Sequence, residues 1–479
     1  MDKQVLYNSK SQPENSIPPP PVAEFAKPAL KPLPPTGQPT PDSTIPEATG
    51  SGGFLRKIVA VVVVIILVVV LVIIFMPKTG QQKVNLVWWG LWEDSQIMAP
   101  IIADFEKENP SITIEYVKQD PKQYRERLMT RIQNNTGPDV FLYHNTWYPM
   151  LTDNLLPLSS DVITQADFKK NYYPVVQQDL THNGAIYGIP LGIDCLALFV
   201  NTDLLSAAGV NPPTTWEEFV KAAKTLTVKD ETGKIKTAGA AFGTYGNVTH
   251  APDLISLLFL QQGVDLNKLS TSAQNQSDVL NFYTSFATGS QNTWDNALDS
   301  SLMLFSQGRL AMYFGYSWDI FTIQRLNKDL KLKIYPVPSL FNRNTTIASY
   351  WVEGVSAKST HQQAAMLFMK YLNKKETAQK FYTEAAKTRA FGELYARTDL
   401  ADTLKSNELI APFVSQLPNA RSSYFASNTF DGDSGLNSTS NTYLGNAINS
   451  ITKDNTSADS AVETFDQGIA QVFAKYGNQ

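Results

Sequence analysis

Hydrophobic and polar positions follow two alternating periods along residues 84–479, and the change of period predicts a mixed α/β fold. Val84 to Trp89 is a short apolar run typical of a strand, and Ser95 to Glu108 has apolar residues at helical spacing. Ile112 to Tyr116 alternates as a strand does, Pro121 is expected to begin a helix that ends near Asn134, and Asp139 to Tyr143 is again a strand. This βαβαβ order indicates a doubly wound α/β layer.

The same two periods recur later in the chain. Thr215-Trp216-Glu217-Glu218 predicts a capping box at the start of an amphipathic helix, because the Thr and the second Glu can satisfy each other's backbone N–H groups. A strand is expected at Leu310 to Phe314. Further helices are expected at about 251–262, 361–373 and 376–386.

An apolar segment near the N-terminus predicts a membrane anchor. Ile58 to Met76 is an uncharged run of 19 residues, almost all Val, Ile and Leu. As a helix it spans roughly 28 Å, the thickness of one hydrocarbon core. A cleaved signal peptide is the alternative, but 57 residues precede the run, and Pro77 to Gly80 is not a small-residue cleavage site. We therefore expect an uncleaved transmembrane helix within residues 54–77, followed by a linker at 78–83.

The first 53 residues hold 12 of the 28 prolines and few bulky apolar residues. Such a segment cannot bury enough surface to fold, so we expect a disordered tail, partly in polyproline II conformation, that acts as a spacer or binds a partner. Arg56 and Lys57 adjoin the apolar run, and more lysines lie in the tail than beyond the run. The positive-inside rule places the tail in the cytoplasm and residues 84–479 outside the cell, with a single membrane crossing.

The composition argues against several functional classes. The chain has one cysteine, Cys195, and four histidines, so neither a disulfide framework nor a Cys/His metal site is expected. A net charge of -4 argues against nucleic acid as a partner. The turn Asp431-Gly432-Asp433 resembles part of a calcium site, but no EF-hand spacing follows and an ordinary turn is favoured. We expect no cofactor and no metal.

Several motifs occur in an order that is specific to one family. "GPDV" stands at Gly137, "L-x-P-L" at Leu155, and "F-x-x-G" followed by Leu-Ala-Met at Phe305. The longest motif runs from Tyr187 to Leu226, with "G-I-P", "N-x-D-L-L" and "P-P-T-T-W-E-E" in sequence, although Val200 stands where a tyrosine is usual. With these motifs, residues 84–479 resemble family 1 extracellular solute-binding proteins, the group that contains maltose-binding protein.

This resemblance implies a two-lobed periplasmic-binding-protein-like fold of type II, with two α/β lobes joined at a hinge. In that family the lobes close on a small solute, and the monomeric receptor then docks on the permease subunits of an ABC importer. By analogy, residues 84–192 with 341–395 form the first lobe, and 193–340 with 396–479 form the second. The chain departs from many relatives because no cysteine for a lipid anchor lies near residue 84. The helix at 58–76 would provide the tether instead.

A sugar presents hydroxyls in its ring plane and apolar C–H faces, so its binding site needs flat aromatic rings together with carboxylates, amides or arginine. Such residues cluster where predicted strands end, which is the edge at which open α/β sheets bind ligands. We expect the solute, most simply a neutral sugar, to contact Trp89, Trp92, Glu93, Asp94, Asn145, Trp147, Asp194, Trp318, Asp319, Trp351, Glu353 and Arg389.

Several of these residues also have a purely structural interpretation. One of Trp88 and Trp89 must pack inward, because neighbouring residues of a strand face opposite sides. Glu93 and Asp94 are also placed to cap the helix that follows. Asp194 is flanked by apolar residues, so it needs a polar partner if it is buried.

We therefore predict a membrane-anchored, extracytoplasmic solute-binding protein of an ABC importer that catalyses no reaction. A carbohydrate-binding sensor or adhesin remains an alternative. A glycoside hydrolase is a further alternative, since it would also combine aromatic residues with a pair of acids.

Overall fold

The computed structural model describes residues 61–66 and 83–476. The chain divides into a unit that ends at Thr79 and a compact unit that begins at Gly80. Residues 61–66 form a short helix. In the ranges that are described, no helix is both long enough and apolar enough to cross a membrane. The predicted tail (1–53), the predicted linker (78–83) and most of the predicted membrane span (58–76) lie outside the described residues.

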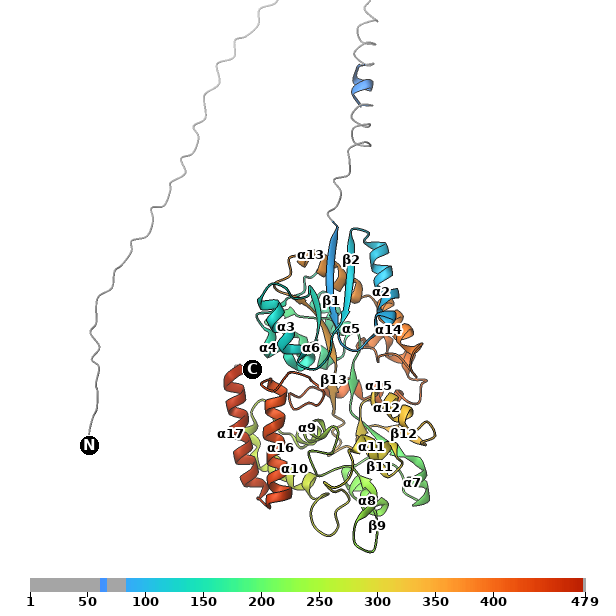
Figure 1. The fold of residues 1–479 in the computed structure, drawn as a ribbon, viewed down its shortest axis with the longest axis vertical. Helices are drawn as coiled ribbons and strands as arrows, with labels where there is room; N and C mark the ends of the chain where they lie inside the picture. Colours follow the sequence, from blue (N-terminus) through green and yellow to red (C-terminus); the bar gives the residue numbers. More distant parts are fainter. Residues whose placement is uncertain (1–60, 67–82, 477–479) are drawn as a thin grey trace, which may run out of the picture. The chain divides into compact units, whose positions relative to one another are not determined.

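The first five-stranded sheet confirms the βαβαβ prediction. Its strand order is β2-β1-β3-β14-β4. β1 (Val84–Gly90) lies parallel to β2 (Ile112–Lys118) and β3 (Val140–His144), whereas β14 (Trp351–Ser356) runs antiparallel between β3 and β4 (Leu155–Leu156). Figure 1 shows this sheet and its helices at one end of the unit; these helices are α2 (Ser95–Glu108), α3 (Tyr124–Gln133), α13 (Gln362–Leu372) and α14 (Lys375–Ala386). We call this assembly the first lobe.

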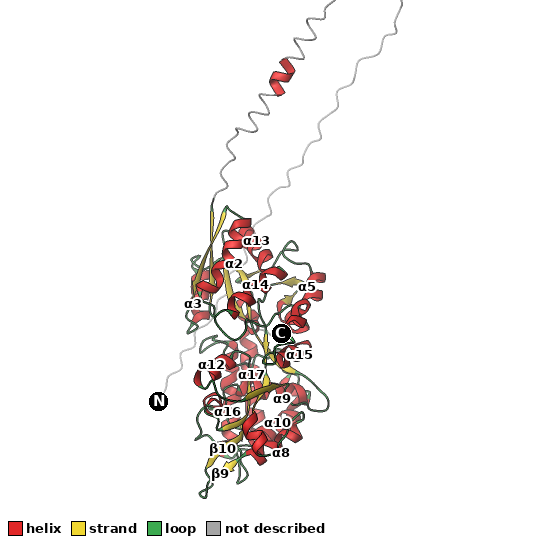
Figure 2. Ribbon diagram, turned by 90° about the vertical axis from the view of Figure 1, so that its right-hand side faces the viewer, coloured by secondary structure: helices red, strands yellow, loops and turns green. Residues whose placement is uncertain are grey.

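A second five-stranded sheet forms the other end of the unit, with strand order β12-β8-β11-β10-β9. The capping box at α8 (Trp216–Leu226) forms as predicted: Thr215 Oγ1 accepts from the Glu218 N–H at 3.2 Å, and the Glu218 carboxylate accepts from the Thr215 N–H at 3.3 Å. The long helices α16 and α17 lie side by side (Figures 1 and 2) and pack on α10. We call this assembly the second lobe; it comprises β8 (Ala197–Asn201), β9 (Val228–Lys229), β10 (Ile235–Ala240), β11 (Leu310–Gly315), β12 (Leu332–Tyr335), α9 (Ala251–Gln262), α10 (Ala273–Thr284), α16 (Leu436–Asp454) and α17 (Ala458–Tyr476).

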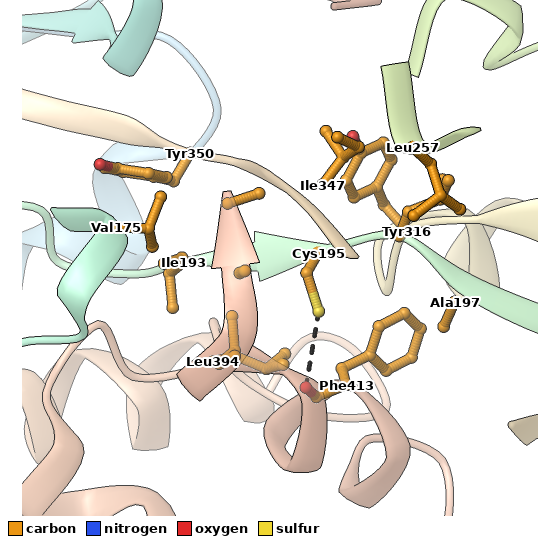
Figure 3. Close-up of a cluster of buried hydrophobic side chains, with 14 of the residues drawn as sticks. Val175, Ile193, Cys195, Ala197, Leu257, Tyr316, Ile347, Tyr350, Leu394 and Phe413 are labelled. Atoms are coloured by element: carbon orange, nitrogen blue, oxygen red, sulfur yellow. Dashed lines mark hydrogen bonds between the residues drawn. The ribbon is translucent and has the colours of Figure 1, made fainter. Parts of the chain in front are cut away.

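Three short strands connect the lobes. β7 (Asp194–Cys195), β13 (Thr346–Ser349) and β15 (Ala420–Arg421) form a sheet in the order β15-β13-β7, and β13 lies between the two larger sheets (Figure 1). Figure 3 shows Cys195 in the apolar core of this crossing, with its thiol directed at the carbonyl oxygen of Phe413, 3.5 Å away. The sequence boundaries of the lobes given above stay predictions.

The start of α3 differs from the prediction. We expected the helix to begin at Pro121, but it begins at Tyr124. The Asp120 carboxylate accepts the Lys122 N–H at 2.8 Å, and Gln123 adopts a left-handed conformation with φ 53°. These two features make a turn of the residues before Tyr124, so the proline lies in the turn and not in the helix.

Shorter elements connect the parts of the two lobes. They are α4 (Tyr148–Leu151), α5 (Gln165–Asn171), α6 (Pro174–Leu180), β5 (Thr181–His182), β6 (Ala185–Ile186), α7 (Thr202–Ala207), α11 (Ser301–Ser306), α12 (Asp319–Leu326), α15 (Ala411–Gln416) and the 3-10 helices η1 (Asn145–Trp147), η2 (Leu269–Ser272), η3 (Thr398–Leu404) and η4 (Leu417–Asn419).

Candidate functional site

A cavity of about 560 Å³ lies between the two lobes, beside the crossing strands. This volume falls within the range of about 300–1,000 Å³ that is usual for ligand pockets. Its walls come from the loop after β1, the start of β14, the start of α12 and the segment before β7. Both lobes therefore contribute to one cavity. Eight of the twelve predicted contact residues line it: Trp92, Glu93, Asp194, Trp318, Asp319, Trp351, Glu353 and Arg389.

Two tryptophans form the aromatic wall on the first lobe. Trp92 lies in the bend that follows Gly90, the last residue of β1, where a side chain would clash with the Tyr116 ring. The Trp92 side chain is 39% exposed, and its ring lies edge-to-face with Trp351, with 5.4 Å between the ring centroids. Behind Trp351, the buried Trp147 packs edge-to-face at 5.3 Å. Trp147 thus supports Trp351, and Trp351 supports Trp92, which stays partly exposed to solvent.

Trp88 and Trp89 face opposite sides of the first sheet, as strand alternation requires. Trp88 is buried, and its indole N–H donates to the Glu353 carboxyl at 2.7 Å. Trp89 is half-buried on the other face, against Tyr124. Trp88 therefore lines the cavity, whereas Trp89 does not.

Glu353 is a buried acid in the cavity wall, with only 3% of its surface exposed. Burial raises its pKa to about 8, and the hydrogen bond from Trp88 only partly offsets that effect. The carboxyl is therefore mostly protonated at neutral pH. A protonated carboxyl can donate one hydrogen bond as well as accept others, which suits a partner that is itself a hydroxyl.

Arg389 connects two further acids of the wall. Its guanidinium lies 2.8 Å from the Glu93 carboxylate and 2.9 Å from that of Glu393, and it stacks over the Phe321 ring at 5.3 Å. Glu93 thus forms an ion pair. Asp94 at the start of α2 makes no capping hydrogen bond with its side chain; instead it is exposed, outside the cavity lining, and pairs with Lys118 at 2.7 Å.

Asp194 has the polar partner that its apolar neighbours required. Its carboxylate accepts from the Ser317 N–H at 2.8 Å, the Ser317 hydroxyl at 2.6 Å and the Cys195 N–H at 2.7 Å. Complete burial raises the pKa of Asp194 well above its usual value, despite these bonds. Because Asp194 belongs to β7 and Ser317 precedes α12, this acid fastens a crossing strand to the second lobe.

The wall of the second lobe is built around Trp318 and Asp319. Trp318 stacks on Tyr316, with 4.3 Å between the ring centroids. One oxygen of Asp319 accepts from His250 Nε2 at 2.9 Å, the Tyr313 hydroxyl at 2.8 Å and the Tyr316 N–H at 3.1 Å. Burial lowers the pKa of His250, but the adjacent Asp319 and the charge of Asp253 together outweigh burial, and the net change is upward. Asp319 thus fixes the loop that presents Trp318.

The structure places Asn145 and Trp147 behind the cavity wall. Asn145 donates to the Asp179 carboxylate at 3.0 Å and to the Ser422 hydroxyl at 2.8 Å, and it lines a separate groove near α17. Both residues follow β3, but the chain turns there into η1, which directs their side chains away from the cavity. With Trp89 and Asp94, they are the four predicted residues that do not line it.

Other lining residues were not predicted. Asn428 and Phe430 come from the loop before α16, and both adopt left-handed backbone conformations. Nothing in the local sequence connects this loop with Trp92. The neighbouring Asp431 forms an ordinary turn: its carboxylate accepts the backbone N–H of Asn437 at 2.6 Å and that of Ser438 at 3.2 Å, at the start of α16.

Comparison with known proteins agrees with this architecture. The chain is 24% identical over 308 residues to the multiple sugar-binding protein of Streptococcus mutans, which covers 59% of this chain and 69% of that protein. It is similar in structure to the sugar-binding protein MalE of Xanthomonas citri, with 21% identity, a TM-score of 0.65, and coverage of 82% of this chain and 98% of that one. An ABC substrate-binding protein of Listeria monocytogenes in complex with cycloalternan gives 19% identity, a TM-score of 0.63, and coverage of 82% and 99%.

The two structural likenesses show the fold, a two-lobed α/β binding-protein architecture. The family follows from the sequence model described as bacterial extracellular solute-binding protein, which matches residues 100–466. The predicted resemblance is therefore confirmed: the chain belongs to the bacterial extracellular solute-binding protein family.

Proposed function

We propose that this chain is the monomeric receptor of an ABC-type importer and that it captures a neutral sugar or oligosaccharide in the cavity between its lobes. The observation that carries the proposal is the composition of that cavity. The first lobe contributes the rings of Trp92 and Trp351, and the second contributes Trp318. Flat rings suit the C–H faces of a sugar, and the acids between them suit its hydroxyls.

The charges of the wall favour a neutral solute over an anion. Among the lining residues Arg389 is the one cation, and it is already paired with Glu93 and Glu393. An anion would have to displace one of these carboxylates. The buried acids Glu353 and Asp194 add hydrogen-bonding capacity without a positive field. Similar proteins also support a sugar, since they include a multiple sugar-binding protein and a cyclo/maltodextrin-binding protein complexed with maltotetraose.

Binding is expected to close the cavity. A ligand favours a closed form only through contacts that it makes with both lobes at once, and Trp351 and Trp318 offer such contacts from opposite sides. Small-angle scattering of the protein should show a smaller radius of gyration with sugar than without. An unchanged radius would contradict closure.

A thermal-shift screen of the full-length protein tests the solute class. A ligand that binds only the folded state raises the melting temperature, by a stabilisation of about 2.7 kcal/mol at 100 times its Kd. We expect a shift with neutral sugars and none with glucuronate or glucose 6-phosphate. A shift with the anionic compounds alone would reject the proposal.

We further propose that the protein binds without turnover and delivers its solute to a permease from the outer face of the membrane, tethered by the helix at 58–76. Release of new reducing ends from an oligosaccharide, abolished by a change at Glu353 or Glu93, would instead support a glycoside hydrolase. Purification without any permease subunit under conditions that preserve transport complexes would favour the sensor or adhesin alternative.

A further inference from the structure

The loop 428–433 brings an aromatic side chain of the second lobe to the rim of the cavity. Phe430 is 38% exposed and its ring centroid lies 5.5 Å from that of Trp92, which belongs to the first lobe. Both rings line the cavity, and both are still partly open to solvent. Two large rings from different lobes thus stand at the entrance with their surfaces incompletely covered.

The backbone of this loop is strained at the residues that face the cavity. Asn428 has φ 57° and Phe430 has φ 52°. Asparagine tolerates the left-handed region, but the side chain of a phenylalanine is strained there. Such conformations persist when surrounding contacts fix them, and they concentrate at functional sites. The position of the Phe430 ring is therefore not a consequence of relaxed loop geometry.

Contacts on both sides hold the loop in place. The Asp431 carboxylate accepts two backbone N–H groups at the start of α16, in the second lobe. The Asp431 carbonyl accepts from Arg125 Nε on α3, in the first lobe, at 2.5 Å. Gly432 lies so close to the Glu126 carboxylate that a side chain at this position would clash with it. The loop is thus fastened across the two lobes, directly beside the entrance.

The rings at the entrance continue into the cavity as a row. Phe430 contacts Trp92, and Trp92 contacts Trp351 with 5.4 Å between centroids. Trp318 lines the same cavity but is packed against Tyr316 and His250, apart from this row. A single sugar ring held between Trp351 and Trp318 would not need Phe430. Successive sugar rings of a longer chain would extend along the row and reach the entrance.

We propose that Phe430 and Trp92 form an outer aromatic subsite that binds the second or a later ring of an oligosaccharide, so that Phe430 sets the preference for oligosaccharides over monosaccharides. This inference rests on the proposed sugar-binding function and narrows its substrate class. Phe430 acts by contact with the outer ring, and the inner site is complete without it.

The chain supplies a matched control for the test. Phe341 also adopts a left-handed conformation, with φ 50°, is 77% exposed and does not line the cavity. Phe430→Asn and Phe341→Asn therefore make the same chemical change and relieve the same type of backbone strain. Only the first removes a ring from the entrance, and neither is expected to impair folding, because asparagine tolerates this conformation.

Isothermal titration calorimetry measures the affinities of the full-length protein and both variants for glucose, maltotetraose, mannose and mannotriose. We expect the wild type to bind one of the oligosaccharides more tightly than its monosaccharide. Phe430→Asn should weaken that oligosaccharide about three- to tenfold and leave the monosaccharide within about twofold, since an aromatic contact contributes about 0.5–1.5 kcal/mol. Phe341→Asn should change neither affinity.

The other outcomes separate the two proposals. An equal loss for the monosaccharide and the oligosaccharide would mean that Phe430 only supports the loop, and no loss at all would mean that the ring does not contact the solute; either result overturns the subsite but leaves sugar binding intact. Wild-type protein that binds the monosaccharide as tightly as the oligosaccharide also overturns it. Failure of the wild type to bind any of these sugars, together with binding of an anionic solute, would reject both proposals.

Discussion

Replacing Glu353 with glutamine is expected to remove a large pH dependence from the stability of the protein while preserving the cavity wall. Burial raises the pKa of Glu353 from 4.5 to about 8 in the folded chain. The contribution of this group to stability is therefore complete below about pH 4.5 and is lost as the pH rises through about 8. The difference of about 3.5 between the two pKa values corresponds to about 5 kcal/mol, at about 1.36 kcal/mol for each pH unit.

The glutamine side chain is a close substitute for the protonated acid. Its amide oxygen can accept the hydrogen bond from Trp88, and its NH₂ group can donate as the carboxylic O–H does. At pH 5 the variant and the wild type should therefore have similar free energies of unfolding. Between pH 5 and pH 8.5 the wild type should lose about 4 kcal/mol relative to the variant, because a small part of the total is already lost below pH 5.

Urea unfolding at a series of pH values, followed by tryptophan fluorescence, measures this difference. Curves of unfolding free energy against pH that stay parallel for the two proteins would refute the assignment of Glu353 as a buried neutral acid. A difference that grew as the pH fell would reverse the sign and indicate an ionised, well-paired carboxylate in the folded state.

Four further substitutions, one of them a control, have defined outcomes. Asp179→Asn should remove a pH dependence centred on about pH 4–6, because burial raises the Asp179 pKa from 3.8 to about 6. The wild type should lose about 2 kcal/mol of stability over that window in the same urea series and the variant should not, whereas a change located above pH 7 would contradict the prediction. Ser317→Ala should cost about 1–3 kcal/mol in thermal unfolding, since it removes one hydrogen bond from the buried Asp194; no measurable loss would show that this bond does not fasten β7. Gly239→Ala should cost about 1–3 kcal/mol because its methyl group would clash with the backbone of α8, whereas Gly246→Ala has open space around it and should stay within about 0.5 kcal/mol; equal costs would contradict the close packing of α8 on β10.

Much of the fold could be predicted because its elements are set by local periodicity. The first strand, helix α2 and strand β2 each bury one face, and the alternation that results is visible in the sequence. The capping box before α8 is likewise a local device. The start of α3 was predicted wrongly because the turn at Gln123 depends on a left-handed residue that has no distinctive sequence signal.

The candidate site could be predicted in part by the rule that ligand contacts lie where strands end. This rule located Trp92 after β1 and Trp318 after β11. It could not indicate which way a side chain turns after the strand, and so it included Asn145 and Trp147, which the turn into η1 directs behind the wall.

Side-chain contacts between residues that are far apart in the sequence could not be predicted, for a different reason. The bond between Trp88 and Glu353 joins residues 265 positions apart, and the pair of Glu93 and Arg389 spans 296 positions. Their meeting depends on how β14 returns to the first sheet and on the path of the chain after α14. Phe430 reaches Trp92 only because its loop is fastened to both lobes.

A crystal structure of the full-length protein with the neutral sugar that raises its melting temperature most would decide whether the cavity between the lobes is the sugar-binding site. We expect a sugar ring within the cavity, with one face against Trp351 or Trp92, hydrogen bonds to acids of the wall such as Glu353, and contacts with Trp318 from the opposite lobe. A sugar bound outside this cavity, or held by one lobe alone, would contradict this expectation.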